Sequence, residues 1–173
     1  MTTKNIYQFS VVNIHGEEVS LADYAGKVLM IVNTASECGF TPQLGELEKL
    51  REERNGQDFE ILAFPSNDFG GQEPLNAGEI EQFCRVKYGT RFPLFDKINV
   101  RGAFAHPMFR FLAERKLNGR VQAKPRWNFH KYIINRKGEV VDFFYPFTKP
   151  TSAKVRKVID RLLSQQIRMN QAL

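Results

Sequence analysis

The hydrophobic and polar positions in the first third of the chain predict a hairpin, two strands and a helix. Apolar and polar residues alternate on both sides of a His-Gly turn, so residues 6–22 predict a β-hairpin. Residues 28–33 (VLMIVN) and 59–64 (FEILAF) are almost continuously apolar, which is typical of strands buried on both faces. Between them, leucines spaced by three residues share one stripe, so a helix is expected over residues 42–56.

The rest of the chain predicts helices and shorter extended segments. A strand, a helix and a strand in succession form a βαβ unit with a right-handed crossover between parallel strands. The order βαβ followed by ββα is that of an α/β, thioredoxin-like fold: a central mixed sheet flanked by helices, with an N-terminal β-hairpin extension, in one domain over residues 1–173. The later elements are a helix from about Ala77 to Tyr88, an irregular or short extended segment at 93–100, a helix over 105–116, a hairpin of 132–134 and 140–144, and an amphipathic helix from Ser152 to about Gln166.

Composition and charge exclude several classes of protein. With 42% hydrophobic and 25% charged residues in 173, the chain is neither disordered nor collagen-like nor a coiled-coil rod. No apolar stretch approaches the roughly 18 residues of a membrane span, so no stable membrane insertion is expected. The N-terminal stretch lacks the apolar region of a signal peptide, which predicts a cytoplasmic protein. The net charge of +6 suits acidic ligands or partners, but no basic run indicates a nucleic-acid tail.

The chain has only two cysteines, Cys38 and Cys84, and three scattered histidines. Two cysteines without nearby histidines cannot build a structural zinc site, so no metal is expected. His106 and His130 are not paired with a nucleophile in the sequence, and structural or surface roles are favoured for both. The cysteines are either two inert buried thiols or a redox pair.

Cys38 has the more suggestive position, in the loop that follows the first buried strand. Ligands of open α/β sheets bind beyond the carboxyl ends of the strands. The loop continues into a predicted helix with Thr41 as N-cap and Pro42 at the first helical position. A helix N-terminus favours a thiolate, whereas the neighbouring Glu37 disfavours it. Thr41 also occupies the second cysteine position of a C-x-x-C motif, where its hydroxyl can cap the helix or bond to the sulfur or its oxygen.

Three segments resemble the cysteine-type branch of the glutathione peroxidase family: residues 33–44 (NTASECGFTPQL), 64–75 (FPSNDFGGQEPL) and 127–129 (WNF). The similarity runs over nearly the whole chain and implies a peroxidase that needs no metal, flavin or haem. In the centre that the family pattern implies, two side-chain amides and one indole supply N–H donors. These donors favour a thiolate and stabilise the alkoxide that leaves the peroxide. The implied peroxidatic centre consists of Cys38, Gln72, Trp127 and Asn128.

The segment at residues 79–84 (EIEQFC) is similar to the thioredoxin-using branch of that family, in which this cysteine is a resolving residue. The resemblance implies that Cys38 reduces a hydroperoxide and becomes a sulfenic acid, that Cys84 condenses with it to a disulfide, and that thioredoxin resets the pair. A helix carrying Cys84 would then have to unwind locally, since bridged Cα atoms lie about 4.4–6.8 Å apart. The alternative is that Cys84 is a buried helix thiol.

Two positions depart from the family pattern: Ser66 replaces a cysteine, and Asp68 replaces a glutamine and is able to alter the local charge. The short stretch between Phe111 and Trp127 implies a monomer or weak dimer with an open site that suits hydrogen peroxide and bulky organic or lipid hydroperoxides. Three alternatives remain: a glutathione-dependent peroxidase, a peroxide sensor or relay that oxidises a partner protein, and a basic nucleic-acid-binding module. The candidates for docking an acidic reductant or glutathione are Lys87, Arg91, Arg120, Lys124 and Arg126.

Overall fold

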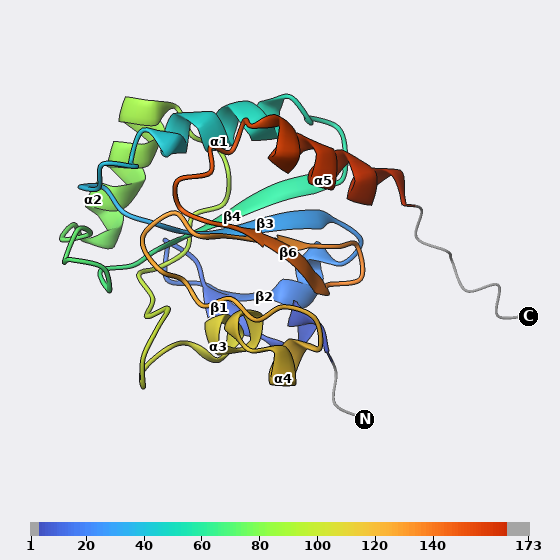
Figure 1. The fold of residues 1–173 in the computed structure, drawn as a ribbon. Coiled ribbons are helices and arrows are strands. Elements are labelled where there is room, and N and C mark those ends of the chain that lie inside the picture. Colours follow the sequence, from blue (N-terminus) through green and yellow to red (C-terminus); the bar gives the residue numbers. More distant parts are fainter. Residues whose placement is uncertain (1–3, 166–173) are drawn as a thin grey trace, which may run out of the picture.

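The computed structural model describes residues 4–165, which are built around a four-stranded mixed sheet (Figure 1). Its strand order is β4-β3-β5-β6, with β3 parallel to β4 and antiparallel to β5, and β5 antiparallel to β6. This arrangement confirms the predicted α/β class with a mixed sheet. The strands are β3 (Val28–Thr34), β4 (Phe59–Pro65), β5 (Lys131–Ile134) and β6 (Val140–Phe144).

Every residue of β3 is buried because helices cover both faces of the sheet. Alternate side chains point to opposite faces: Met30 packs in one apolar cluster with α1 (Gln43–Glu52) and α5 (Ala153–Ser164), and Ile31 packs in the other with α3 (Pro107–Ala113). Figure 1 shows α1 and α5 above the sheet and α3 and α4 (Arg115–Asn118) below it. The leucine stripe predicted for the first helix is therefore a core-facing stripe.

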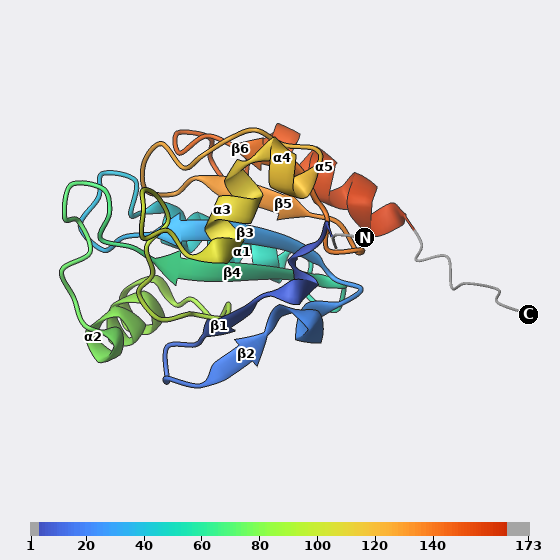
Figure 2. The ribbon, with the colours of Figure 1, turned by 90° about the horizontal axis from the view of Figure 1, so that it is seen from below.

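The N-terminal hairpin forms a separate two-stranded sheet of β1 (Ser10–Val12) and β2 (Glu18–Ser20), followed by the 3₁₀ turn η2 (Leu21–Tyr24). Viewed from below, α3 crosses the sheet over β3, and the hairpin lies beyond β4 (Figure 2). The predicted strand began too early, because residues 6–8 form a 3₁₀ turn, η1 (Ile6–Gln8). The Asn5 side chain accepts a hydrogen bond from the Tyr7 N–H and stabilises this turn.

The four predicted helices differ from those of the structure in their limits or in their continuity. The first ends at Glu52 rather than near Gly56, and the helix predicted over 105–116 is divided into α3 and α4 by Glu114, whose backbone is extended. The last ends at Ser164, and Gln166 lies outside the described residues. The helix predicted over 77–88 is α2 (Ala77–Gln82) continued by a π-helical segment, η3 (Phe83–Lys87).

The segment at residues 93–100 is extended only in part, through single bridges of Leu94 to Ala63 and of Phe95 to Asn13. It therefore links the main sheet to the N-terminal hairpin. Within residues 4–165, none of the helices is both long and apolar enough to cross a membrane.

Candidate active site

Cys38 lies in a closed turn between β3 and α1. The Phe40 N–H donates to the Cys38 sulfur at 3.3 Å, and the Thr41 N–H donates to the Cys38 carbonyl at 3.0 Å. The Cys38 side chain is only 9% exposed. A backbone N–H aimed at the sulfur stabilises negative charge on it. The sequence does not predict this contact, because every residue except proline carries a backbone N–H.

Thr41 is not a helix cap, which corrects the sequence prediction. Pro42 is the N-cap residue of α1, and it makes no capping bond with its side chain. The Thr41 hydroxyl instead accepts the Cys38 N–H at 2.9 Å and donates to the Ala35 carbonyl at 2.8 Å. Buried backbone groups need partners, and the hydroxyl supplies one to each side of the turn. Thr41 therefore fixes the backbone that carries the sulfur.

Gln72 lies in the glycine-rich loop that follows β4. Its carbonyl accepts the Glu37 N–H at 3.0 Å, which brings this loop against the cysteine turn. The Gln72 side-chain oxygen accepts a hydrogen bond from the Asn128 amide at 3.0 Å, so the NH₂ end of Gln72 remains the donor end of the pair. Gly70 has φ +65°, and a Cβ there would lie 3.2 Å from the Trp127 ring. Only glycine combines this backbone conformation with the close approach of the indole.

Trp127 and Asn128 lie in the segment that leads into β5, and Asn33 of β3 holds this segment. The Asn33 amide donates to the Trp127 carbonyl at 3.0 Å, and the Asn33 carbonyl accepts the Phe129 N–H at 2.6 Å. Asn128 is fully buried, and the Trp127 ring packs on Phe69 with 5.5 Å between ring centroids. The structure thus brings Gln72, Trp127 and Asn128 together and sets the cysteine turn beside Gln72.

The two positions that depart from the family pattern have structural roles. The Asp68 carboxylate accepts the N–H groups of Val100 and Arg101 at 2.7 and 3.3 Å. The Arg101 guanidinium donates to the Asp68 carbonyl at 2.6 Å and lies over the Phe69 ring at 4.3 Å. Buried Ser66 accepts the Asp68 N–H at 3.3 Å. The negative charge of Asp68 is therefore directed at the 100–101 backbone.

Cys84 lies on η3, in the same apolar cluster as Cys38, and both cysteines are free thiols. The Cys84 side chain is 3% exposed. Burial, reinforced by the charge of Glu73, raises the pKa of the Cys84 thiol to about 12, and Arg85 opposes this shift. Burial of Cys84 thus favours the protonated thiol over the thiolate.

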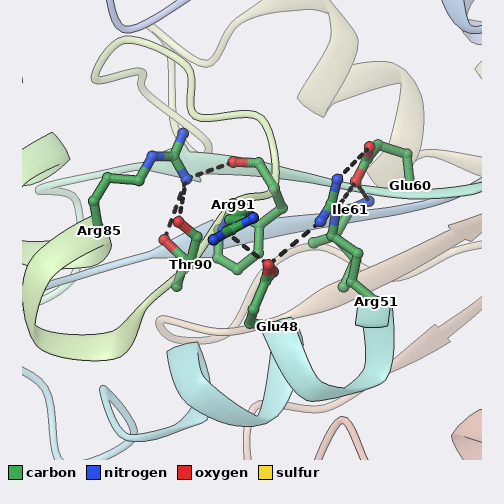
Figure 3. A network of polar contacts seen from close by, with 8 residues as sticks. Glu48, Arg51, Glu60, Ile61, Arg85, Thr90 and Arg91 are labelled. Carbon is green, nitrogen blue, oxygen red and sulfur yellow. Dashed lines mark hydrogen bonds and ion pairs between the residues drawn. The ribbon is translucent and has the colours of Figure 1, made fainter. Parts of the chain in front are cut away.

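A polar network holds the chain after Cys84 in place (Figure 3). The Arg85 guanidinium donates to the Thr90 carbonyl at 3.0 Å, the Thr90 hydroxyl at 3.2 Å and the Phe92 carbonyl at 2.9 Å. The Arg91 N–H donates to the buried carboxylate of Glu48 on α1 at 2.9 Å. Hydrogen bonds therefore join residues 85–92 to one another and to α1.

That network continues to the sheet. Glu48 also pairs with Arg51 at 3.3 Å, and Arg51 pairs with Glu60 of β4 at 2.7 Å. Through Glu48 and Arg51, the loop that follows η3 is therefore connected to α1 and to β4.

A pocket of about 370 Å³ adjoins the Trp127 segment. Its apolar wall includes Val100, Ala105 and Phe109. Arg126 directly precedes Trp127 in the chain. The Arg101 guanidinium lies over the Phe69 ring, and the Phe69 ring packs against the Trp127 indole. Four basic side chains surround the pocket together with the carboxylate of Glu114: Arg101, Arg110, Lys124 and Arg126.

The remaining predicted docking residues have other surroundings. Arg120 pairs with Glu139 at 3.1 Å, and the Lys87 ammonium lies 5.3 Å from the Phe83 ring centroid. Of the five basic candidates, the pocket collects only Lys124 and Arg126.

Neither histidine considered above has the surroundings of a general base. Burial, with the charges of Lys131 and Arg126, lowers the pKa of His130 to about 4. His106 accepts the Met108 N–H at 3.1 Å as the N-cap of α3. Among residues 4–165, no cluster of three or more His, Cys, Asp or Glu side chains is placed to hold a metal ion.

The mixed sheet with helices on both faces defines an α/β protein of thioredoxin-like fold, and the cysteine turn follows β3, one of its two inner strands. A thiol:disulfide interchange protein of the thioredoxin family from Chlorobium tepidum matches 90% of this chain and 92% of its own, at TM-score 0.64 and 14% identity. This likeness shows the fold. The crystal structure of Trgpx in its apo form is closer, at TM-score 0.74 and 32% identity over 94% of this chain and 98% of its own.

The sequence comparisons identify the family. The sequence model of glutathione peroxidase matches residues 6–113. The glutathione peroxidase of Lactococcus lactis subsp. cremoris is 47% identical over 146 residues, 84% of this chain and 92% of that protein. The hydroperoxy fatty acid reductase gpx1 of Synechocystis is 44% identical over 165 residues, 91% of this chain and 95% of that protein. The chain belongs to the glutathione peroxidase family and is an enzyme of the peroxidase class.

Replacing Thr41 with valine tests the cysteine turn. The variant keeps the side-chain shape but leaves the Cys38 N–H and the Ala35 carbonyl without their partner, at a cost of about 1–3 kcal/mol. We expect the bimolecular rate constant of Cys38 with hydrogen peroxide to fall about tenfold, the equivalent of about 1.4 kcal/mol. Stopped-flow oxidation of the reduced protein measures this rate, and an unchanged rate contradicts the assigned role.

Proposed function

We propose that this protein is a thiol peroxidase that reduces hydrogen peroxide and organic hydroperoxides through Cys38, with Cys84 as the resolving cysteine and thioredoxin as the reductant. The observation that supports it best is that the hydrogen-bonded pair Gln72–Asn128 and the neighbouring Trp127 lie beside the cysteine turn. We further propose that the enzyme acts in the cytoplasm as a monomer or weak dimer.

The proposed cycle has three steps, each balanced in atoms and electrons. The Cys38 thiolate attacks one peroxide oxygen, the O–O bond breaks, and the leaving alkoxide takes a proton to give water or an alcohol. Cys38 is then a sulfenic acid, and the Cys84 sulfur displaces its oxygen as water to form a disulfide. A dithiol reductant returns two electrons and two protons and restores both thiols.

The donor group has a defined task in the first step. The Gln72 NH₂, the Trp127 indole N–H and the Asn128 amide are neutral donors that stabilise charge on the sulfur and on the departing oxygen. Because Asn128 binds the Gln72 oxygen, the amide of Gln72 is already oriented before peroxide arrives. Preorganised donors of this kind each contribute about 10²–10³ to a rate.

The basic pocket supports organic hydroperoxides that carry an acidic group. Its apolar wall of Val100, Ala105 and Phe109 suits a hydrocarbon chain, and the cationic rim suits a carboxylate. The Synechocystis relative is named a hydroperoxy fatty acid reductase, in keeping with such a substrate. The basic side chains around the pocket also suit the carboxylates of glutathione. Glutathione is therefore the alternative reductant.

A peroxide sensor or relay is the second candidate, and the burial of Cys84 favours it. A protonated thiol with a pKa of about 12 on an ordered segment attacks a sulfenic acid slowly. A long-lived sulfenic acid at Cys38 is available to a thiol of a partner protein. A trapped mixed disulfide with one partner, together with poor turnover, would favour this candidate over the peroxidase.

A coupled NADPH-oxidation assay with cumene hydroperoxide tests the proposal, using either thioredoxin with its reductase or glutathione with its reductase. We expect turnover with thioredoxin, none in Cys38→Ser, and in Cys84→Ser a single oxidation with a loss of thioredoxin-driven turnover of at least about tenfold. Undiminished thioredoxin turnover of Cys84→Ser contradicts the two-cysteine cycle. Turnover with glutathione alone would mean that the basic side chains around the pocket bind glutathione. No turnover with either reductant would reject the peroxidase proposal.

Replacing Arg85 with methionine tests the movement of η3. The variant removes three hydrogen bonds from a charged donor, each worth about 1.5–3 kcal/mol, and frees the segment after Cys84. We expect disulfide formation after one equivalent of peroxide to become about tenfold faster, since roughly 1.4 kcal/mol of that restraint would suffice. The disappearance of dimedone-trappable sulfenic acid reports the rate.

Arg136→Met is the matched control, because Arg136 also holds three partners, the Gly26 carbonyl, the Asp58 carboxylate and the Leu163 carbonyl, far along the chain from η3. We expect no acceleration in this variant. Equal rates in wild type and Arg85→Met, or equal acceleration in both variants, would show that Arg85 does not restrain Cys84.

The double variant Arg110→Gln, Lys124→Gln tests the pocket. We expect the KM for a long-chain fatty acid hydroperoxide to rise about three- to tenfold, because exposed charges each contribute about 0.2–1 kcal/mol to such a contact. The KM for uncharged cumene hydroperoxide should not change. Lys154→Gln, Lys157→Gln on α5 removes the same charge elsewhere and is the control. A parallel rise for both peroxides would reject the pocket as the carboxylate site.

A further inference from the structure

Lys131, the first residue of β5, is fully buried and is bonded to carbonyl groups. Its ammonium donates to the Phe129 carbonyl at 2.7 Å, the Pro146 carbonyl at 3.1 Å and the Tyr145 carbonyl at 3.5 Å. An ammonium has three N–H donors and no acceptor, so the three carbonyls match its donors in number. Burying a charge is costly unless its partners are well placed, and here the partners are main-chain dipoles.

The closest of these carbonyls belongs to a residue in an unusual conformation. Phe129 has φ +68°, the left-handed region that aromatic residues rarely adopt, and within residues 4–165 it is the one non-glycine residue there. Its N–H is held by the Asn33 carbonyl at 2.6 Å, and its own carbonyl is held by Lys131. The left-handed turn directly follows Trp127 and Asn128 in the chain.

A second carbonyl connects Lys131 to the cysteine turn. The Pro146 carbonyl also accepts a hydrogen bond from the Gln43 amide at 2.7 Å. Gln43 begins α1, and its N–H donates to the Phe40 carbonyl at 2.8 Å. Phe40 is the residue whose N–H donates to the Cys38 sulfur. The Lys131 ammonium is therefore at the junction of the donor segment, the loop after β6 and the start of α1.

We infer that Lys131 is a positioning residue: its ammonium locks the left-handed turn at Phe129 and holds the Trp127–Asn128 donor pair in register with the Cys38 turn. This inference deepens the proposed function and rests on it for the effect on rate. Lys131 acts through the Phe129 and Pro146 carbonyls. Burial lowers the pKa of Lys131, and the charge of Glu46 raises it. The three carbonyl acceptors favour the protonated form, which has three N–H donors.

The test is Lys131→Met, which fills the same space and removes all three donors. Trp127 is the only tryptophan of the chain, so fluorescence excited at wavelengths that tyrosine does not absorb reports on the donor segment alone. We expect a shifted Trp127 emission maximum in the reduced protein and a fall of about tenfold or more in the rate constant of Cys38 with hydrogen peroxide. Far-UV circular dichroism verifies that the variant is folded.

Asn118→Leu is the matched control. Asn118 is likewise buried, and its amide nitrogen donates to three carbonyls, those of Phe111, Leu112 and Val121, at 2.8, 3.2 and 2.9 Å. It lies at the end of α4, and its amide makes no hydrogen bond to residues 127–129. We expect lower stability to urea but an unchanged Trp127 emission maximum and an unchanged rate constant, which separates positioning from general destabilisation.

The outcomes decide the inference separately from the proposed function. If Lys131→Met keeps the wild-type emission maximum, or if Asn118→Leu shifts it equally, the positioning role is wrong. If the wild-type protein does not react with peroxide but Lys131→Met shifts the emission, Lys131 holds the segment and the peroxidase proposal fails. If Lys131→Met does not fold, Lys131→Gln, which keeps a polar head with two N–H donors, is measured in the same way and read by the same criteria.

Discussion

Two hydrogen bonds from Asn33 hold the candidate site together. Asn33 is the second-to-last residue of β3; its amide binds the Trp127 carbonyl and its carbonyl binds the Phe129 N–H. Asn33 is fully buried, and the Trp127 carbonyl and the Phe129 N–H are the partners of its side-chain NH₂ and of its backbone carbonyl. Leaving either group buried without a partner would be costly. If they were absent, Asn128 would lose its defined position and Gln72 would lose the partner that orients it.

The direction of the strands explains why these groups meet. β3 and β4 are parallel, so their carboxyl ends lie at one edge of the sheet, and β5 is antiparallel to β3, so its amino end lies at the same edge. The cysteine turn follows β3, the glycine-rich loop follows β4, and the Trp127–Asn128 segment precedes β5. Three segments far apart in sequence therefore converge at the edge where α/β proteins bind ligands.

The site combines a rigid part with a restrained part. Around Cys38, backbone bonds, Thr41 and the ammonium of Lys131 fix the geometry. Around Cys84, the Arg85 side chain donates to the Thr90 and Phe92 carbonyls, and the Cys84 carbonyl accepts the Thr90 N–H. π-Helical turns often occur at functional positions. The proposed cycle needs preorganised donors in its first step and contact between the two sulfur atoms in its second.

The amino-acid sequence by itself determined the secondary structure that carries the site and the residue types available to it. The buried runs of β3 and β4 and the stripe of α1 are local patterns, and their lengths and spacing suffice to predict them. The family motifs likewise identified Cys38, Gln72, Trp127 and Asn128 as candidates. Only the tertiary structure decided that Thr41 binds the cysteine turn, that Asp68 anchors residues 100–101, and that Lys131 joins three segments. Each depends on hydrogen bonds to main-chain groups, which every residue carries and no local pattern distinguishes.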